Sequence, residues 1–123
     1  MILTPGTRLG PYEILSALGA GGMGQVYRAR DTRLDRFVAI KVLVETFGLD
    51  ARTALLREAR AAAALNHPNI CTIHEIGDVD DHVFIVMEHV DGHALSTVVA
   101  NEVAAATVVR YGIQIADALG YAH

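Results

Sequence analysis

The 123-residue sequence is poor in several features, and each shortage excludes a class of protein. It has one cysteine, Cys71, so no disulfide can form within the chain and a reducing compartment is expected. It has no uncharged apolar run of about 18 residues, because Asn101 and Glu102 interrupt the best stretch, residues 93–109. The first six residues lack the basic and apolar regions of a secretory signal. We expect a cytoplasmic chain without a membrane segment; a longer protein could carry an anchor elsewhere.

The composition is typical of one small globular domain. Hydrophobic residues make up 52% of the sequence and charged residues 20%, which is enough apolar material for a core. The net charge of -4 argues against a nucleic acid partner but not against a nucleotide, because backbone N–H groups can hold phosphates. The six histidines are irregularly spaced and only one cysteine is available, so no metal site is expected. We expect Cys71 to be a small buried hydrophobic residue.

Hydrophobic alternation predicts strands in the first two-thirds of the chain and helices after them. The expected strands span residues 14–18, 25–30, 37–44, 70–76 and 83–88. Asp50 can cap a helix that runs to about Leu65, where Asn66-His67-Pro68 would end it. After Asp91-Gly92 a short helix and a longer one, from about Val103, are expected. The sequence therefore predicts an α+β fold with two units, residues 1–92 and 93–123, joined by a hinge.

A glycine cluster follows the first expected strand. Its sequence fits the pattern G-x-G-x-x-G-x-V and reads Gly19-Ala20-Gly21-Gly22-Met23-Gly24-Gln25-Val26. Such clusters also form ligand-free turns, and a dinucleotide-binding site shares the first six positions, with Glu45 as a possible acidic partner. A dinucleotide site needs a helix after the glycines, whereas Val26 and Tyr27 here begin a strand. The order strand, glycine loop, strand favours a flap over phosphates.

Two charged residues occur where apolar ones are expected. Lys41 lies within an apolar, β-branched strand and shares a face with Ala39 and Leu43. Glu58 lies on the helical stripe that includes Ala62, is extended by Ala59, and is expected to face the core. Each has an ordinary explanation: a lysine at a sheet edge, or a solvated glutamate at the margin of the stripe. An ion pair between them would account for both charges and direct Lys41 toward the phosphates.

Together these features resemble the protein-kinase signature. The glycine cluster, Val38-Ala39-Ile40-Lys41 and the helical Glu58 occur in the kinase order and spacing. The sequence around Gly21 is similar to that of bacterial serine/threonine kinases of the Hanks type. The same is true of two further segments, Arg57-Glu58-Ala59-Arg60 and Asn66-His67-Pro68-Asn69-Ile70. The resemblance implies a small-lobe fold: an antiparallel sheet of about five strands with the helix that kinases call αC, followed by the first helices of a large lobe.

The resemblance also implies the site. Lys41 would contact the α- and β-phosphates of ATP, and Glu58 would anchor Lys41. Val26 and Ala39 would enclose the adenine, Met87 would be the gatekeeper, and the backbone at Glu88 and Val90 would bind the adenine edge. The residues expected to contact ATP are Leu18, Gly19, Ala20, Gly21, Gly22, Met23, Gly24, Gln25, Val26, Ala39, Lys41, Met87, Glu88 and Val90.

The sequence departs from the family at its end. Tyr121-Ala122-His123 is similar to the end of the helix before the catalytic loop, and no His-Arg-Asp or Asp-Phe-Gly motif is present. Mg²⁺ binding and protein substrates would therefore depend on a large lobe beyond His123. We expect the chain to be the ATP-binding part of a serine/threonine kinase, inactive by itself. The alternative is a non-catalytic, kinase-like module that binds a nucleotide or serves as a scaffold.

Overall fold

The computed structural model describes residues 3–21, 24–43, 49–79 and 82–123. Within these residues the chain forms a sheet of six strands, one helix beside it and two further helices. The strands are β1 (Arg8–Leu9), β2 (Tyr12–Gly21), β3 (Gly24–Asp31), β4 (Arg36–Leu43), β5 (Ile73–Val79) and β6 (His82–Glu88). The helices are α1 (Leu49–Ala63), α2 (Leu95–Val99) and α3 (Ala105–Ala122). The predicted α+β order of strands and helices is confirmed.

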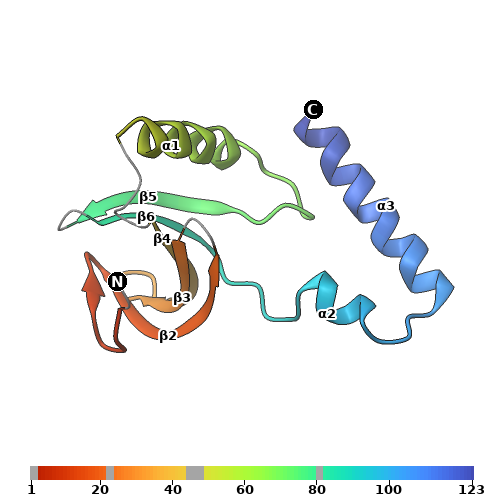
Figure 1. Cartoon of the computed structure of the whole chain (residues 1–123), viewed down its shortest axis with the longest axis horizontal. Helices are drawn as coiled ribbons and strands as arrows, with labels where there is room; N and C mark the ends of the chain where they lie inside the picture. The colour runs from red at the N-terminus through yellow and green to blue at the C-terminus, as the bar shows by residue number, and fades with distance from the viewer. Residues whose placement is uncertain (1–2, 22–23, 44–48, 80–81) are drawn as a thin grey trace.

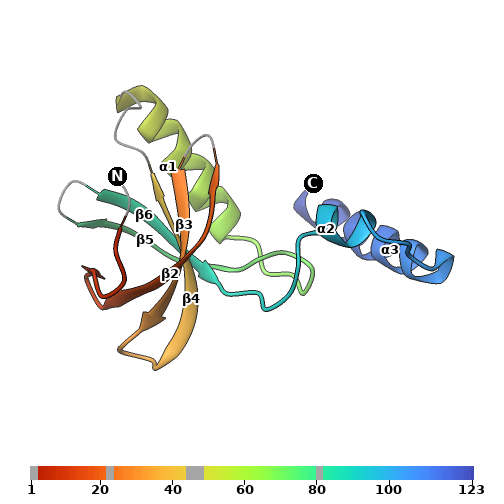
Figure 2. The same cartoon turned by 60° about the horizontal axis from the view of Figure 1, so that its bottom comes forward.

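Every neighbouring pair of strands in the sheet is antiparallel, and the strand order is β1-β2-β3-β4-β6-β5. The sheet is strongly curled, and α1 lies alongside β5 (Figures 1 and 2). The prediction of about five strands omitted β1. This strand has only two residues, paired Arg8 with Glu13 and Leu9 with Tyr12, and is too short for a period of two to be visible.

The main hydrophobic core lies against one face of the sheet. Alternate residues of β3, β4 and β6 point into it, among them Tyr27, Ile40 and Val86, each at most 1% exposed. The N-terminal segment closes the core, because Leu3 packs within it and its backbone N–H donates to the Tyr27 hydroxyl at 2.9 Å. The intervening residues of β3, β4 and β6 therefore face the opposite side.

A polar cluster joins the two ends of the curled sheet. Tyr12 at the start of β2 donates a hydrogen bond to the Glu75 carboxylate of β5, although these strands are not neighbours in the sheet. Arg33 donates to the Tyr12 hydroxyl at 3.2 Å and to Glu75 at 3.3 Å. Asp31, which is fully buried, accepts from the backbone N–H groups of Arg33 and Leu34 at 3.0 and 3.3 Å. The cluster thus fixes both the β3–β4 turn and the curl of the sheet.

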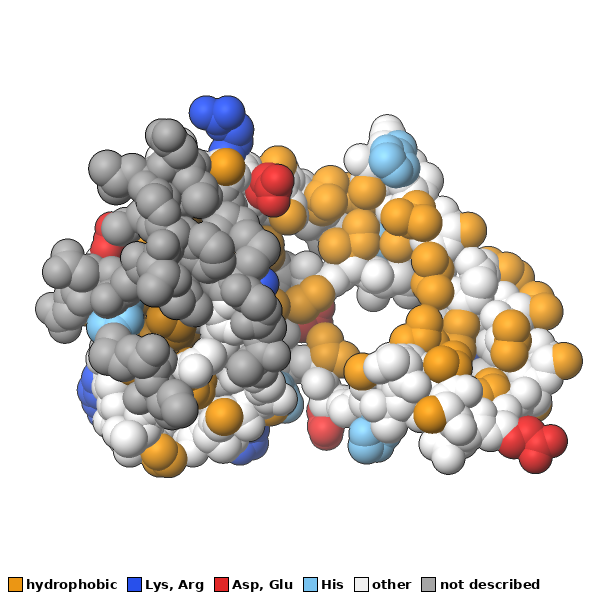
Figure 3. Space-filling view, in the orientation of Figure 1, with side chains coloured by type: hydrophobic (Ala, Val, Ile, Leu, Met, Phe, Trp, Pro, Cys, Tyr) orange, Lys and Arg blue, Asp and Glu red, His pale blue; other side chains and the backbone are white. Residues whose placement is uncertain are grey.

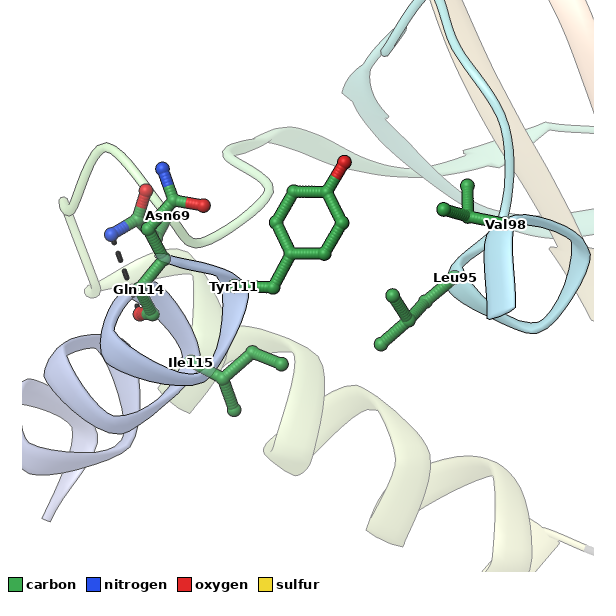
Figure 4. A pocket seen from close by; sticks show the side chains of 6 residues that line it. All are labelled: Asn69, Leu95, Val98, Tyr111, Gln114 and Ile115. Atoms are coloured by element: carbon green, nitrogen blue, oxygen red, sulfur yellow. Dashed lines mark hydrogen bonds between the residues drawn. The ribbon is translucent and has the colours of Figure 1, made fainter. Parts of the chain in front are cut away.

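Helices α2 and α3 lie away from the sheet (Figures 1 and 2). Neither helix contains a buried residue. The loop after α1 contacts α3: His67 Nε2 lies 3.2 Å from the Asp117 carboxylate, and the Asn69 side chain donates to the Gln114 carbonyl at 3.4 Å. Figure 4 shows Asn69 and Gln114 beside a hollow of about 270 Å³, whose other lining residues are Leu95, Val98, Tyr111 and Ile115. Among the described residues, no helix has the length and apolar character needed to cross a membrane.

Candidate functional site

The strand register brings four of the predicted site residues onto the face of the sheet opposite the main core. Val26 of β3 is paired with Lys41 of β4, and Ala39 of β4 is paired with Met87 of β6. Paired residues of neighbouring strands lie on the same face, and Ala39 and Lys41 are two residues apart on one strand. Val26, Ala39, Lys41 and Met87 therefore form one surface, which we call the cleft face.

The cleft face is partly accessible. Val26, Lys41 and Met87 are half-buried, whereas Ala39 is 7% exposed. The surface combines apolar side chains with one ammonium group, which suits a ligand that has an apolar ring and an anionic end. Lys41 supplies the charge at the end nearer to the glycine segment, because Val26, its partner, lies two residues after Gly24.

The glycine segment forms the hairpin between β2 and β3. Gly19 is paired with Val26, Ala20 with Gln25, and Gly21 with Gly24. Gly22 and Met23 lie outside the described residues, so the predictions for them stay predictions. The strand after the glycines confirms a strand–loop–strand arrangement, and the dinucleotide-binding alternative fails because it needs a helix there.

The surroundings of Gly24 differ from those of Gly19. A Cβ atom on Gly24 would lie 2.3 Å from the Val42 carbonyl oxygen, so packing against β4 alone requires glycine there. A Cβ atom on Gly19 would meet nothing within 4 Å. Leu18, beside it, is 50% exposed, so this end of β2 leaves room for a ligand above the cleft face. Gln25 accepts a hydrogen bond from the Tyr27 hydroxyl, which directs its side chain toward the core side.

The segment after β6 borders the other end of the cleft face. The Glu88 backbone N–H donates to the Thr72 carbonyl at 2.8 Å, and its carboxylate accepts from the Thr72 N–H at 3.1 Å. These bonds fix the end of β6, while Val90 is 66% exposed. Val90 is thus at the surface, and Glu88 is held next to Met87 at the border of the cleft face.

Cys71 lies next to this segment and differs from its prediction. It is exposed rather than buried, because the loop that carries it runs along the surface. Its Sγ lies 3.6 Å from the Glu88 carbonyl oxygen. Partial desolvation and the neighbouring Glu88 carboxylate raise the pKa of the Cys71 thiol, so it stays protonated near neutral pH.

The structure does not bring Lys41 and Glu58 together. The Glu58 side chain is exposed, and among the described residues neither Lys41 nor Glu58 has an ion-pair partner. Helix α1 instead turns Ala59, 6% exposed, toward the sheet, with Leu56 and Ala62 half-buried beside it. The expected stripe contained both Glu58 and Ala59; Ala59 faces inward as expected, whereas Glu58, the adjacent residue, does not.

Sequence reasoning missed two residues that share the cleft face. Arg28 is paired with Ala39, and Phe37 precedes Ala39 by two residues on β4. The Arg28 guanidinium carbon lies 4.0 Å from the centre of the Phe37 ring. The alternation that grouped Lys41 with Ala39 would have found Phe37 on the same strand, whereas Arg28 is placed opposite Ala39 only by the register of β3 with β4.

Comparison with known proteins identifies the family that has this arrangement. A family model described as the protein kinase domain matches residues 12–123. The chain belongs to the protein kinase family. This confirms the resemblance on which the predicted site rests, and it agrees with the sheet, the helix beside it and the glycine hairpin.

The chain is similar to serine/threonine kinases of mycobacteria. The chain is 38% identical over 122 residues to serine/threonine-protein kinase PknE of Mycobacterium tuberculosis, covering 96% of this chain and 22% of the relative. It is 41% identical over 124 residues to PknJ of Mycobacterium bovis, covering 98% of this chain and 21% of the relative. The chain thus spans about a fifth of the length of these kinases.

A solved structure shares the fold over the same region. The kinase domain of Mycobacterium tuberculosis PknI superimposes with a TM-score of 0.84 at 30% identity. The match covers 99% of this chain and 51% of the PknI kinase domain. The chain therefore corresponds to about half of a kinase domain, the half that contains the curled sheet and the first helices after it.

Proposed function

We propose that this chain is the ATP-binding part of a serine/threonine protein kinase that acts on proteins in the cytoplasm. The observation that supports this most directly is the cleft face, where the register brings Val26, Ala39, Lys41 and Met87 together. The glycine hairpin lies at one end of that face and the fixed end of β6 at the other. Residues 1–92 would form the small lobe and hinge, and residues 93–123 the first part of the large lobe.

The chain's own residues supply two kinds of contact. Val26, Ala39 and Met87 would enclose the adenine ring, and the backbone at Glu88 and Val90 would bind its edge. Backbone N–H groups of the glycine hairpin and the Lys41 ammonium would hold the phosphates, as charge and hydrogen-bond donors do in phosphoryl transfer. These contacts position ATP; they do not by themselves activate an acceptor hydroxyl.

Magnesium does not fit the cleft face by itself. Mg²⁺ needs oxygen ligands in near-octahedral geometry, and the four residues of the cleft face offer apolar side chains and an ammonium. Its carboxylate ligands would have to come from outside this face.

Lys41 gives a direct test of nucleotide binding, because it is the only lysine in the sequence. An ATP analogue that carries an acyl group on its terminal phosphate transfers that group to a nearby amine, forming an amide and releasing the nucleotide. We expect mass spectrometry to find the label on Lys41 and excess ATP to prevent it. Labelling of the Met1 amino group alone, or labelling of Lys41 that ATP does not reduce, would contradict the proposal.

The absence of catalytic motifs gives a second test. Because the sequence contains no His-Arg-Asp or Asp-Phe-Gly motif, the 123-residue chain should bind ATP without transferring phosphate. Labelled ATP, magnesium and a generic protein substrate measure this, with Lys41→Met as the background. Transfer above that background would favour an unexpected mechanism, whereas binding without transfer agrees equally with the scaffold alternative.

The proposed role of Glu58 separates the kinase from the scaffold. We propose that in an active, longer chain α1 shifts so that Glu58 pairs with Lys41. Lys41→Met and Glu58→Gln should then each strongly reduce phosphorylation, and the double variant should lose much less than the product of the two effects. Independent, multiplying losses would show that the residues do not act as a unit. In the 123-residue chain, Glu58→Gln should not change ATP binding, since Glu58 is exposed here.

A further inference from the structure

The cleft face continues beyond Ala39, away from Lys41. Alternate residues of β4 place Phe37, Ala39 and Lys41 in a row, with successive members about 7 Å apart. On β3, Arg28 is paired with Ala39, yet its guanidinium lies 4.0 Å from the centre of the Phe37 ring. The Arg28 side chain is therefore directed along the row toward the end opposite Lys41.

The segment after β6 borders the same end. Arg28 and Phe37 line an open hollow of about 640 Å³ together with His89 and Asp91. That volume is in the range of small-molecule sites. His89 and Asp91 flank Val90, whose backbone is proposed to bind the adenine edge, so the hollow adjoins the proposed base site.

The direction of a bound nucleotide follows from this row. With the phosphates at Lys41 and the base over Ala39, the part of the base farthest from the phosphates faces Arg28 and Phe37. An arginine near a nucleotide usually contacts phosphate, because guanidinium and phosphate form paired hydrogen bonds. Here the stacking on Phe37 holds the cation at the other end of the ligand.

Arg28 also differs from its neighbour Arg30 in its partners. Arg30 donates to Asp35 at 2.9 Å through Nε and is paired with it through Nη2 at 2.5 Å. Among the described residues, Arg28 has no carboxylate within ion-pair distance. A planar, weakly hydrated guanidinium that is already stacked on one ring can contact a second aromatic ring at small entropic cost.

We propose that Arg28, held by Phe37, is a binding residue that contacts the adenine base and makes no contact with the phosphates. The inference rests on the proposed ATP site and adds a contact to it. It predicts that Arg28 contributes equally to the binding of adenosine and of ATP, because both carry the same base.

The test compares the dissociation constants of adenosine and ATP for the 123-residue chain and four variants. Arg28→Ala and Phe37→Ala should weaken both ligands by the same factor, about three- to tenfold, the size of one partly exposed cation–π contact. Arg28→Lys should lose most of the affinity that Arg28 contributes, because it keeps the charge but not the planar group. Arg30→Ala, on the same face but already paired with Asp35, should change neither constant by more than about twofold.

The outcomes separate the inference from the proposed function. If Arg28→Ala and Arg28→Lys weaken ATP but not adenosine, Arg28 contacts the phosphates and the inference is wrong. If neither variant changes either constant, the inference is wrong while the ATP site stands. If the unaltered chain binds neither ligand, the proposed function fails and the inference fails with it. Arg28→Lys keeps the test decisive should Arg28→Ala or Phe37→Ala fail to fold.

Discussion

The sheet and the two helices after it are held in the fold in different ways. In the sheet, residues such as Ala29, Ile40 and Val86 are fully buried in one continuous core. In α2 and α3 no residue is buried, and large hydrophobic side chains such as Ile113, 65% exposed, face solvent. Figure 3 shows hydrophobic side chains gathered over these helices. One chain therefore contains a region with a core and a region without one.

The difference indicates where the stability of this chain resides. Burying apolar area supplies most of the free energy of folding, so the sheet should supply nearly all of it here. The contacts of α3 with the loop around His67 are three hydrogen bonds and one ring contact, in which the His67 and Tyr121 ring centres lie 5.1 Å apart. The proposed ATP site lies in the stable region, whereas the helices offer an apolar surface that needs a cover.

The largest expected effect concerns this apolar surface. We predict that the 123-residue chain self-associates or binds a chaperone, because exposed apolar area on α3 favours association. A chain that ends near Gly92 should be monomeric, although it loses two helices. Size-exclusion chromatography with light scattering measures both. A monodisperse monomer of the full chain would show that the helices are covered within it, and the comparison between the two regions would fail.

The second prediction makes the same substitution in both regions. Gly77→Ala places a Cβ atom 2.2 Å from the Phe84 ring, which is 2% exposed and packed edge-on against Tyr12, so the ring has little room to move. We expect a loss of about 1–3 kcal/mol in unfolding free energy. Gly112→Ala in α3 meets nothing within 4 Å and should stabilise the helix, by about 0.5–1 kcal/mol at most. Urea denaturation of the two variants measures both changes in unfolding free energy. Changes of the same sign and size would contradict the comparison between the two regions.

The third prediction concerns Tyr12, in the cluster that joins β2 to β5. Burial, together with the hydrogen bond to Glu75 and its negative charge, raises the pKa of Tyr12 from 10.0 to about 12. The native state thus holds the phenolic proton more tightly than the unfolded state. The resulting stability is complete below pH 10 and is lost as the pH rises through 12. At pH 11 the loss amounts to about 1.4 kcal/mol.

Denaturant unfolding at pH 9 and pH 11 measures this loss. Tyr12→Phe should remove the part of the pH dependence that Tyr12 causes, because no proton is left to titrate. The matched control is Tyr111→Phe, which changes a tyrosine of α3 that has no buried partner. This variant should keep the pH dependence of the unfolding free energy. If the unfolding free energy of Tyr12→Phe still falls by the same amount between pH 9 and pH 11, the loss arises elsewhere in the chain.

Local patterns predicted some strands closely and others less so, since β2, expected over 14–18, spans Tyr12–Gly21. The expected strands 37–44 and 83–88 agree with β4 and β6 to within a residue. The expected strand 70–76 begins three residues too early, because the Ile70 N–H donates to the His67 carbonyl in a turn and the Thr72 N–H donates to the Glu88 carboxylate. The Asn66 backbone N–H donates to the Tyr121 hydroxyl, 55 residues away, and no local period contains that contact.

Local patterns also predicted only part of the proposed site. Alternation grouped Ala39 and Lys41 correctly, because a strand has only two faces. It could not orient Glu58, because the faces of a helix pass into one another and Ala59 is as good an inward residue. It also overlooked Arg28, since an arginine on a strand is usually explained by solvent exposure. Register, which needs the partner strand, was required to place Arg28 opposite Ala39.

The smallest expected effect is at the contact between the two regions. His67 accepts from the Asn69 backbone N–H at Nδ1, 3.0 Å away, so a neutral His67 donates from Nε2 to Asp117. Because the Asp117 side chain is 69% exposed, water replaces it readily, and Asp117→Ala should lower the unfolding free energy by less than about 0.5 kcal/mol. The hydrogen-exchange rates of the core strands should not change. A loss above about 1 kcal/mol, or faster exchange in β4 and β6, would show that α3 supports the sheet, contrary to the division drawn from burial.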